Sequence, residues 1–413
     1  MKIVRITSLG PSYLRQFYAA RPQLAGACFA SQKEALDRDG YGGADFWTHA
    51  LEPFGYQGLD IYLDAEPLQR AWAAENCFPD PQRAGLAEIV IEQVRRFQPE
   101  VLWYDHDDER ILAAIKEQVP SLRLALGWTG SAIPNSQHWR HLDLVLSCAQ
   151  ESVDILRRAG VPATQLHHAF DPRINDRLAP GEKRYDLTFI GQLIRTSQFH
   201  LKREELLLEL AKVTGITIFS SSARLGAVND AKAQLSVWIY HAFNLMKRMG
   251  VDPKRLASLP QVGWIANERE TPPAFLVHPG LKPFLRREVY GMEMFQVQAA
   301  SKISLNIHAD SSPRFASNMR LFEITGVGGC MVADWKENFA ELFEPDREVV
   351  LYRSPQECIE KVRWLCEHPA ERERIAAAGQ KRTLASHTFA HRAPELDRII
   401  RTNIGNRRGR GEG

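Results

Sequence analysis

Four polar side chains that could together bind a ligand with an anionic group and hydroxyls follow a predicted strand at residues 303–307. They are Arg314, Asn318, Arg320 and Glu323. Arginines that lead into a short helix suit a diphosphate, because guanidinium groups and the unpaired N–H groups of a helix start both bind anions. Glu323 lies one turn into that helix on the side of Arg320, where a carboxylate can accept hydrogen bonds from vicinal ribose hydroxyls. The pattern favours binding of a diphosphate-linked nucleoside, and the alternative is a surface ion pair between Arg320 and Glu323.

Further residues near the ends of predicted elements are candidates for the same binding site. They are Gly191, Arg203, His308, Gly328 and Gly329. Gly191 follows a strand, where a glycine either approaches a phosphate or makes a turn. His308 ends its strand and could face a bound sugar, whereas Arg203 either reaches the site or begins a solvated helix. The glycine pair lets the backbone pass closely and ends the short helix.

Acidic and imidazole side chains follow another predicted strand, at residues 101–104. Asp105, His106 and Asp107 are candidates for a general base that takes the proton of an acceptor hydroxyl. The alternative is that they are helix-start residues favoured by the helix dipole. The Asp105-x-Asp107 spacing also imitates a metal-binding signature, which we discount because the pair lies in the half of the chain opposite to the arginines. We therefore expect neither a metal ion nor a cofactor.

Side chains after other predicted strands are candidates for the pocket that binds the molecule carrying this hydroxyl. They are Tyr13, Trp128 and Thr129. Lone aromatic residues more often belong to the core, which is the alternative for the first two. His167 and His168 have no partners for a metal site in the sequence and are interpreted as structural.

The elements that must position these residues alternate along the chain. The expected order is a strand at 2–9, a strand at 59–63, a helix at 86–97, a strand at 101–104, a helix around 111–115, strands at 122–128 and 144–147, a helix ending at Gly160 and a short strand near Leu166. Such alternation predicts a parallel sheet covered by helices. The connection between the first two strands is unusually long and rich in aromatic residues.

A second alternating series follows a stretch of charged and turn residues near 171–181. It comprises strands at 186–190, 216–219, 303–307 and 331–333, and helices at 203–213, 290–300 and 319–325. Residues 223–283 show no readable pattern, whereas Ser354 and Glu357 form a capping box that predicts a further helix. We expect an α/β protein with Rossmann-like domains at 1–175 and 176–390 and a disordered tail at 404–413.

Composition limits the class of protein. Lys and Arg total 52 against 50 Asp and Glu, so the net charge of +2 gives no global attraction to nucleic acid. No stretch approaches the about 20 apolar residues of a membrane span, which leaves peripheral membrane contact open. Six scattered cysteines show no zinc or disulfide spacing and are expected to be buried thiols. With no signal peptide, these features predict a cytoplasmic protein.

Several segments in the second half of the chain resemble one known protein family. Residues 318–329, Asn-Met-Arg-Leu-Phe-Glu-Ile-Thr-Gly-Val-Gly-Gly, and residues 301–306 before them resemble the CgeB-like (spore-maturation-protein-like) glycosyltransferases of the GT-B fold. Residues 350–359, followed by 376–379 and 386–388, carry the same resemblance. It covers roughly residues 186–400.

The resemblance implies two Rossmann-like domains with parallel sheets that face each other across a cleft. It further implies a nucleoside diphosphate sugar held by the second domain, with Glu323 on the ribose and Asn318 and Arg320 near the diphosphate. A last helix, about 391–402, would cross back to the first domain. Many retaining relatives carry a second carboxylate eight positions before the ribose glutamate, where this chain has Phe315. The sequence therefore favours inversion over retention.

The predicted activity is transfer of a hexose or deoxyhexose to a hydroxyl of a glycan, a protein or a small molecule. Two alternatives stay open: a nucleotide-sugar epimerase or hydrolase on the same fold, and a catalytically silent protein that binds sugar nucleotides. A nicotinamide oxidoreductase is not favoured, because no GxGxxG follows the first strand.

Overall fold

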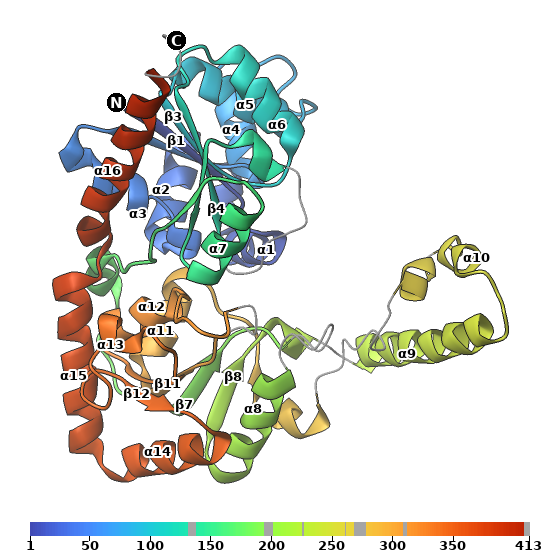
Figure 1. Cartoon of the computed structure of the whole chain (residues 1–413), viewed down its shortest axis with the longest axis vertical. Helices are drawn as coiled ribbons and strands as arrows, with labels where there is room; N and C mark the ends of the chain where they lie inside the picture. The colour runs from blue at the N-terminus through green and yellow to red at the C-terminus, as the bar shows by residue number, and fades with distance from the viewer. Residues whose placement is uncertain are drawn as a thin grey trace.

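The chain folds into two stacked α/β units, each built on a six-stranded parallel sheet (Figure 1). The computed structural model describes residues 1–130, 138–193, 201–224, 227–260, 262–267, 278–308 and 312–408. No helix in these ranges is long and apolar enough to cross a membrane. The α/β fold with two parallel sheets confirms the expectation from the alternating pattern.

The first unit carries the sheet order β2-β1-β3-β4-β5-β6. Its strands are β1 (Lys2–Thr7), β2 (Gln57–Tyr62), β3 (Val101–Asp105), β4 (Leu124–Thr129), β5 (Leu144–Ser147) and β6 (Ala163–Gln165). Its helices are α1 (Pro11–Ala19), α2 (Phe29–Asp39), α3 (Phe46–Leu51), α4 (Glu66–Glu75), α5 (Leu86–Phe97), α6 (Glu109–Gln118) and α7 (Gln150–Arg158). The long connection between β1 and β2 thus contains three of these helices, which its aromatic composition concealed.

The second unit carries the order β12-β11-β10-β7-β8-β9. Its strands are β7 (Tyr185–Ile190), β8 (Ile216–Phe219), β9 (Leu285–Arg286), β10 (Ser301–Asn306), β11 (Cys330–Asp334) and β12 (Val350–Tyr352). The helices that follow β7 are α8 (Leu201–Val213), α9 (Ala227–Arg248), α10 (Pro253–Ala257), α11 (Gly291–Ala299), α12 (Arg320–Gly326), α13 (Phe339–Leu342), α14 (Pro355–Glu367), α15 (Pro369–Ser386) and α16 (Phe389–Arg408). The predicted helix is present as α14, with Ser354 Oγ accepting the N–H of Glu357 at 3.2 Å, whereas the Glu357 carboxylate accepts the N–H of Arg353 at 2.7 Å and not that of Ser354.

Both faces of the first sheet are buried, so its strands are apolar almost throughout. In β3, Leu102 and Tyr104 pack with α5 and α6. Val101 and Trp103 belong instead to a larger cluster that includes α3 and α16. Alternate side chains point to opposite faces of a strand, and here both faces meet helices.

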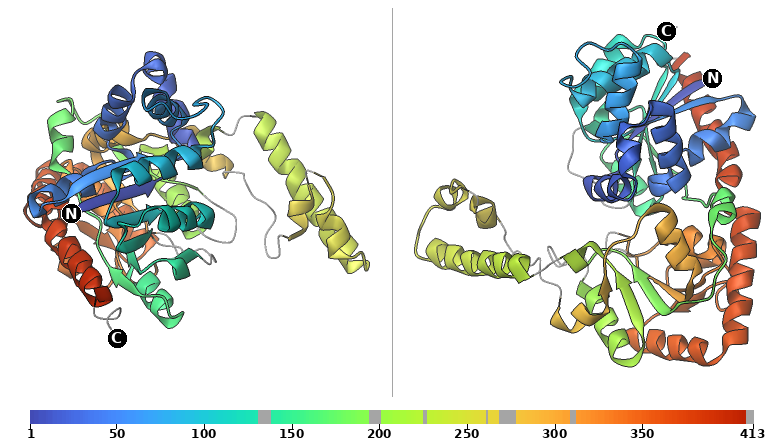
Figure 2. Two further views of the ribbon diagram at one scale, coloured as in Figure 1. Left: turned by 90° about the horizontal axis from the view of Figure 1, so that it is seen from above. Right: turned by 180° about the vertical axis from the view of Figure 1, so that it is seen from behind.

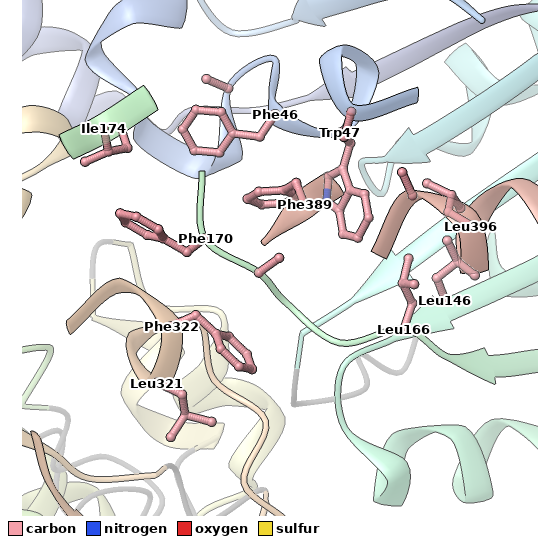
Figure 3. Close-up of a cluster of buried hydrophobic side chains, with 14 of the residues drawn as sticks. Phe46, Trp47, Leu146, Leu166, Phe170, Ile174, Leu321, Phe322, Phe389 and Leu396 are labelled. Atoms are coloured by element: carbon pink, nitrogen blue, oxygen red, sulfur yellow. The ribbon is translucent and has the colours of Figure 1, made fainter. Parts of the chain in front are cut away.

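That larger cluster continues into the second unit and joins the two sheets. Phe46 and Phe389 lie on the side of the first unit, Phe322 lies on the side of the second, and Phe170 lies between them (Figure 3). The last helix, α16, runs back along the first unit (Figures 1 and 2), where Tyr56 donates a hydrogen bond to Asp397 at 2.8 Å. The two sheets are therefore held by one continuous apolar core.

Two sequence expectations need correction. The predicted disordered tail at 404–413 is wrong for its first residues, because α16 continues to Arg408 and Ile404 is buried in the core. Residues 409–413 lie outside the described ranges. The expectation that all six cysteines are buried is also wrong, since Cys28, Cys77 and Cys366 are exposed free thiols. A small apolar side chain at a helix end or turn does not require burial.

The contact between Phe170 and Gly326 yields a test of the joined core. A Cβ atom at position 326 would lie 2.4 Å from Cγ of Phe170. Alanine is preferred over glycine in a helix by about 1 kcal/mol, but overpacking a core costs about 1–3 kcal/mol. Gly326→Ala should therefore lower the thermal unfolding midpoint. The control is Gly405→Ala in α16, where a Cβ meets nothing within 4 Å and the midpoint should stay or rise. Equal midpoints for both variants would contradict this packing.

Candidate active site between the two sheets

A cavity of about 220 Å³ lies between the two units, at the carboxyl ends of β1, β3 and β4. Ligands bind at this edge in open parallel sheets. The first unit supplies most of its wall, and α12 of the second unit supplies Glu323. The lining residues are Arg5, Thr7, Ser8, Gly40, Tyr41, Gly42, Gly43, Phe46, Trp47, Trp103, Asp105, Trp128, His168, Ala169, Phe170, Asp171, Phe295, Met319, Glu323 and Phe389.

Asp105 is the acidic side chain at the end of β3 and lines this cavity. Thr7 stands beside it in register on β1 and donates a hydrogen bond from Oγ1 to Asp105 Oδ2 at 3.2 Å. Burial raises the pKa of the Asp105 carboxyl, and Arg5 and Thr7 oppose that rise only in part. A carboxylate with a raised pKa is a better proton acceptor than one in water.

His106 and Asp107 lie outside the cavity lining, although both were candidates for the base. The Nδ1 atom of His106 accepts the N–H of Asp108 at 3.0 Å, which ties the ring into the turn before α6. The side chain of Asp107 is 82% exposed. Asp108 caps α6 by accepting the N–H of Arg110. Of the three candidates, the structure brings only Asp105 to the cavity.

Trp128 and His168 form another part of the wall. Their rings meet edge to face, with centroids 5.1 Å apart. Burial lowers the pKa of His168 to about 4, with smaller contributions from His167 and Arg5, so the ring is neutral near pH 7. His168 lines the cavity, a position that the interpretation of this residue as structural did not include.

Tyr13 and Thr129, the other acceptor candidates, do not line the cavity. Tyr13 donates a hydrogen bond to Asp39 at 2.9 Å and stacks on Tyr41, whose ring does reach the cavity. Thr129 is buried, and its carbonyl oxygen accepts the hydroxyl of Ser147 at 2.8 Å. Both residues support the wall from behind.

Glu323 and Arg320 form an ion pair at the start of α12. The Glu323 side chain is 10% exposed and lines the cavity, and Arg320 is 25% exposed. They are therefore not a solvated surface pair. The carboxylate and the guanidinium lie side by side at the carboxyl edge of the second sheet, as complementary groups for a ligand that carries both hydroxyls and an anion.

The loop before α12 is held by polar contacts from both units. Glu151 of α7 accepts the N–H groups of Arg314 and Phe315, each at 3.0 Å. The guanidinium of Arg314 pairs with Glu337 at 2.8 Å and is 63% exposed. Asn318 exchanges side-chain hydrogen bonds with Asn306. Arg314 and Asn318 thus fix this loop, and neither lines the cavity.

Two further donor candidates organise the ends of the strands in the second sheet. Arg203 donates to the carbonyl oxygens of Gln192 at 3.0 Å and Ile307 at 2.8 Å, and so ties the segments that follow β7 and β10. His308 is buried, and its Nδ1 lies 2.7 Å from Asp334. Among the described residues, Nε2 of His308 has no hydrogen-bond partner.

Asp334 is the acidic member of a small charged group at this edge. Burial opposes its ionisation, but His308 and Lys336 outweigh burial and hold the pKa of Asp334 well below its usual range. The described residues contain no group of three His, Cys, Asp or Glu side chains arranged to hold a metal ion.

The glycine candidates have local roles. The N–H of Gly191 donates to the carbonyl oxygen of Phe219 at 3.1 Å. A Cβ atom at position 191 would lie 2.8 Å from the Phe189 ring. Gly328 and Gly329 lie at the end of α12 away from Arg320. Their backbone N–H groups donate to the carbonyl oxygens of Thr325 and Ile324, which ends the helix. The donor assignment of this pair needs correction, because the chain there enters β11 from the amino edge of the sheet.

A glycine-rich loop after α2 forms a part of the cavity wall that was not among the predicted site residues. Gly40, Gly42 and Gly43 all have positive φ, a conformation that other residues rarely adopt. Arg5 donates to the carbonyl oxygens of Ala44 at 2.8 Å and Gly42 at 3.1 Å, which fixes this loop against β1. The glycine cluster at 40–43 was the available signal.

Comparison with known proteins agrees with this geometry. A family model described as glycosyl transferase-like matches residues 274–398, which include α12. No curated protein sequence matches the chain. Among solved structures, HepE from Anabaena in complex with UDP-glucose is 14% identical, with a TM-score of 0.50 over 97% of this chain and 100% of that chain.

Two other solved structures are similar over nearly the whole chain. Sucrose-phosphate synthase from Thermosynechococcus elongatus is 10% identical, with a TM-score of 0.51 over 98% of this chain and 100% of its own. A glycosyltransferase from Rickettsia africae is 8% identical, with a TM-score of 0.50 over 98% of this chain and 99% of its own. At such identities the likeness establishes the shared two-domain architecture, the GT-B fold.

The depressed pKa of His168 predicts a pH effect on stability. The unfolded chain binds a proton at this ring near pH 6.5, whereas the folded chain does so only near pH 4. The contribution of His168 to stability is therefore complete above about pH 6.5 and is lost as the pH falls toward 4. His168→Phe removes this loss, so the thermal midpoint of the variant should gain on the wild type between about pH 7 and 4.5.

A matched substitution controls for the general effect of acid. His141 is exposed, and His141→Phe should leave the pH dependence of the midpoint as in the wild type. A constant midpoint difference between His168→Phe and the wild type across this range would show that the ring is not shielded from protonation.

Proposed function

We propose that this chain, a glycosyltransferase of the GT-B fold, moves a hexose or deoxyhexose from a nucleoside diphosphate sugar to an acceptor hydroxyl. The observation that carries the proposal is the shared cavity: Asp105 at the end of β3 and Glu323 of α12 line the same space. A proton acceptor from one unit thereby faces a ribose-binding carboxylate from the other. We further propose that the acceptor binds on the side of the first unit and the donor on the side of the second.

The size of the cavity supports this division. Pockets for whole drug-sized ligands have volumes of about 300–1,000 Å³, whereas this cavity has about 220 Å³. It suits a single sugar ring rather than a complete nucleotide sugar. We place the nucleoside and diphosphate outside it, along the start of α12, with Glu323 on the ribose hydroxyls and Arg320 at the diphosphate.

The proposed step is an in-line displacement. The acceptor oxygen attacks the anomeric carbon of the donor sugar while Asp105 takes the hydroxyl proton. The bond between that carbon and the diphosphate oxygen breaks, and the nucleoside diphosphate leaves with the electron pair. Arg320 stabilises the negative charge that develops on the leaving group. No step in this reaction uses a metal ion or a cofactor.

The expected stereochemical outcome is inversion. A single general base near the acceptor suffices for an inverting transfer. Phe315 stands where many retaining relatives carry a second carboxylate, and its ring lies beside the Arg314 guanidinium. The motif at 318–329 supports a finer placement of the chain among the CgeB-like glycosyltransferases.

Donor binding tests the role of Glu323. Hydrogen bonds to charged groups contribute about 1.5–3 kcal/mol, so Glu323→Ala should weaken donor affinity about 10- to 100-fold. The measurement is calorimetric titration with uridine diphosphate, the nucleotide in the similar HepE structure. Glu371→Ala, which removes a 44% exposed glutamate paired with Arg374 on α15, is the control and should bind normally. An unchanged affinity of Glu323→Ala for uridine diphosphate would contradict the proposed contact between Glu323 and the ribose.

Turnover tests the role of Asp105. Removing a general base lowers kcat about 10²- to 10⁴-fold, so Asp105→Asn should lose activity to that degree while donor affinity is retained. Asp107→Asn alters a neighbouring carboxylate that is 82% exposed, and it should keep near-normal turnover. If Asp107→Asn lost activity and Asp105→Asn did not, the general base would be Asp107, in the turn before α6.

Incubating the wild-type chain with donor alone separates transfer from the donor-only reactions. Release of free sugar or an epimerised donor at the rate of transfer would identify a hydrolase or epimerase. Donor binding without turnover across acceptors would identify a silent sugar-nucleotide-binding protein.

A further inference from the structure

An arm projects from the second unit, away from both sheets (Figures 1 and 2). It consists of α9, α10 and a short 3-10 helix at Gly263–Asn267, all between β8 and β9. The arm has its own small core, which packs α9 against the other two helices. The members of this core are Tyr240, Phe243, Leu256, Ile265 and Ala266.

The opposite side of α9 carries an exposed apolar stripe. Leu235, Trp238 and Leu245 of α9 are 61%, 69% and 60% exposed, and Met249, which continues the last turn through a hydrogen bond to the carbonyl oxygen of Leu245, is 75% exposed. Their spacings of three, seven and four residues place all four on one face of the helix. This face is separate from the one that packs on the core of the arm. Large apolar side chains gathered in this way mark an interaction surface.

Basic side chains lie at the outer end of the same arm. Residues 235–260 contain four basic side chains and one acidic side chain. Arg248, Lys254 and Arg255 are exposed, whereas Lys247 donates to the carbonyl oxygen of Ala266 at 2.6 Å. The arm therefore combines a tryptophan-bearing apolar stripe with a local positive charge, although the whole chain is nearly neutral.

We propose that this arm docks on an anionic membrane surface, with the α9 stripe among the lipid headgroups and acyl-chain ends. A helix with Trp and Leu on one face and nearby Lys or Arg lies in the interface of a bilayer rather than across it. Each Lys or Arg near an anionic leaflet adds about a fivefold preference for it. The charge and the exposed apolar face thus favour the same occupant.

A second copy of the chain fits this surface less well. The stripe spans about two heptads, whereas coiled-coil pairing is indicated by three or four. The outer end of the arm carries four basic side chains and one acidic side chain, so two arms side by side would repel each other. An anionic bilayer satisfies both features.

The position of the arm gives the docking a direction. The segment that holds it follows Phe219, which pairs with Ile190 at the carboxyl edge of the second sheet. The same edge bears Arg320 and Glu323. A chain docked by this arm would be attached to the membrane from the edge of the second sheet that bears its cleft.

Vesicle co-sedimentation of the full chain tests the proposal. The wild type should pellet with phosphatidylcholine vesicles that contain phosphatidylglycerol, but not with phosphatidylcholine alone. Trp238→Glu with Met249→Glu should weaken binding at least about tenfold, because two exposed apolar anchors become charged. Lys254→Ala with Arg255→Ala should weaken it about fivefold for each charge removed, and added salt should reduce that difference.

A surface tryptophan elsewhere provides the control. Trp364 on α14 is 44% exposed, and Trp364→Glu should bind vesicles as the wild type does. Donor titration should give equal affinities for all variants, which keeps this test independent of the proposed active site. The proposal fails if the wild type stays in the supernatant with anionic vesicles or if the α9 variant binds normally. It also fails if light scattering shows that the wild type is a dimer, that the α9 variant is a monomer, and that the wild type does not bind vesicles.

Discussion

The two backbone crossings between the units are joined at Phe170, and the site depends on this junction. The backbone N–H of Phe170 donates to the carbonyl oxygen of His387 at 2.9 Å, and the N–H of Phe389 donates to the carbonyl oxygen of Phe170 at 3.1 Å. The Phe170 ring lies against Gly326 of α12 and also lines the cavity. One residue thus touches both crossings, the proposed donor helix and the cavity wall. The distance between Asp105 and Glu323 is consequently set by packing at this junction.

Burial at this junction also determines the ionisation of the cavity wall. The same loss of water raises the pKa of the Asp105 carboxyl and lowers that of the His168 imidazole, because both groups are charged in only one of their protonation states. Near neutral pH the imidazole is therefore uncharged and leaves the wall near Trp128 apolar. An apolar wall strengthens the electrostatic effect of the charged groups that line the cavity, among them Arg5, Asp105 and Glu323.

The sequence predicts those parts of the molecule that local rules control. Asp105 and Trp128 could be placed near one site because both lie at the carboxyl ends of strands of one parallel sheet, and such strands end at a common edge. Glu323 could be placed only at the corresponding edge of the other sheet. Partners distant in the chain were not accessible in this way. Arg314 turned out to pair with Glu337, and His168 reached the cavity through a linker without regular pattern. Single-sequence patterns contain no information on such contacts.

The long insertion shows the same division between local and tertiary information. A helix whose apolar residues face both its own small core and the exterior has no single hydrophobic face, so the periodicity of α9 could not be read from the sequence. Its location, however, follows from topology. In a parallel sheet every segment that follows a strand leaves at the carboxyl edge, which is also the ligand-binding edge. An insertion after β8 therefore has to start at the edge of the sheet that bears the cleft, and an arm at this point that binds a surface attaches the chain to that surface from its ligand-binding edge.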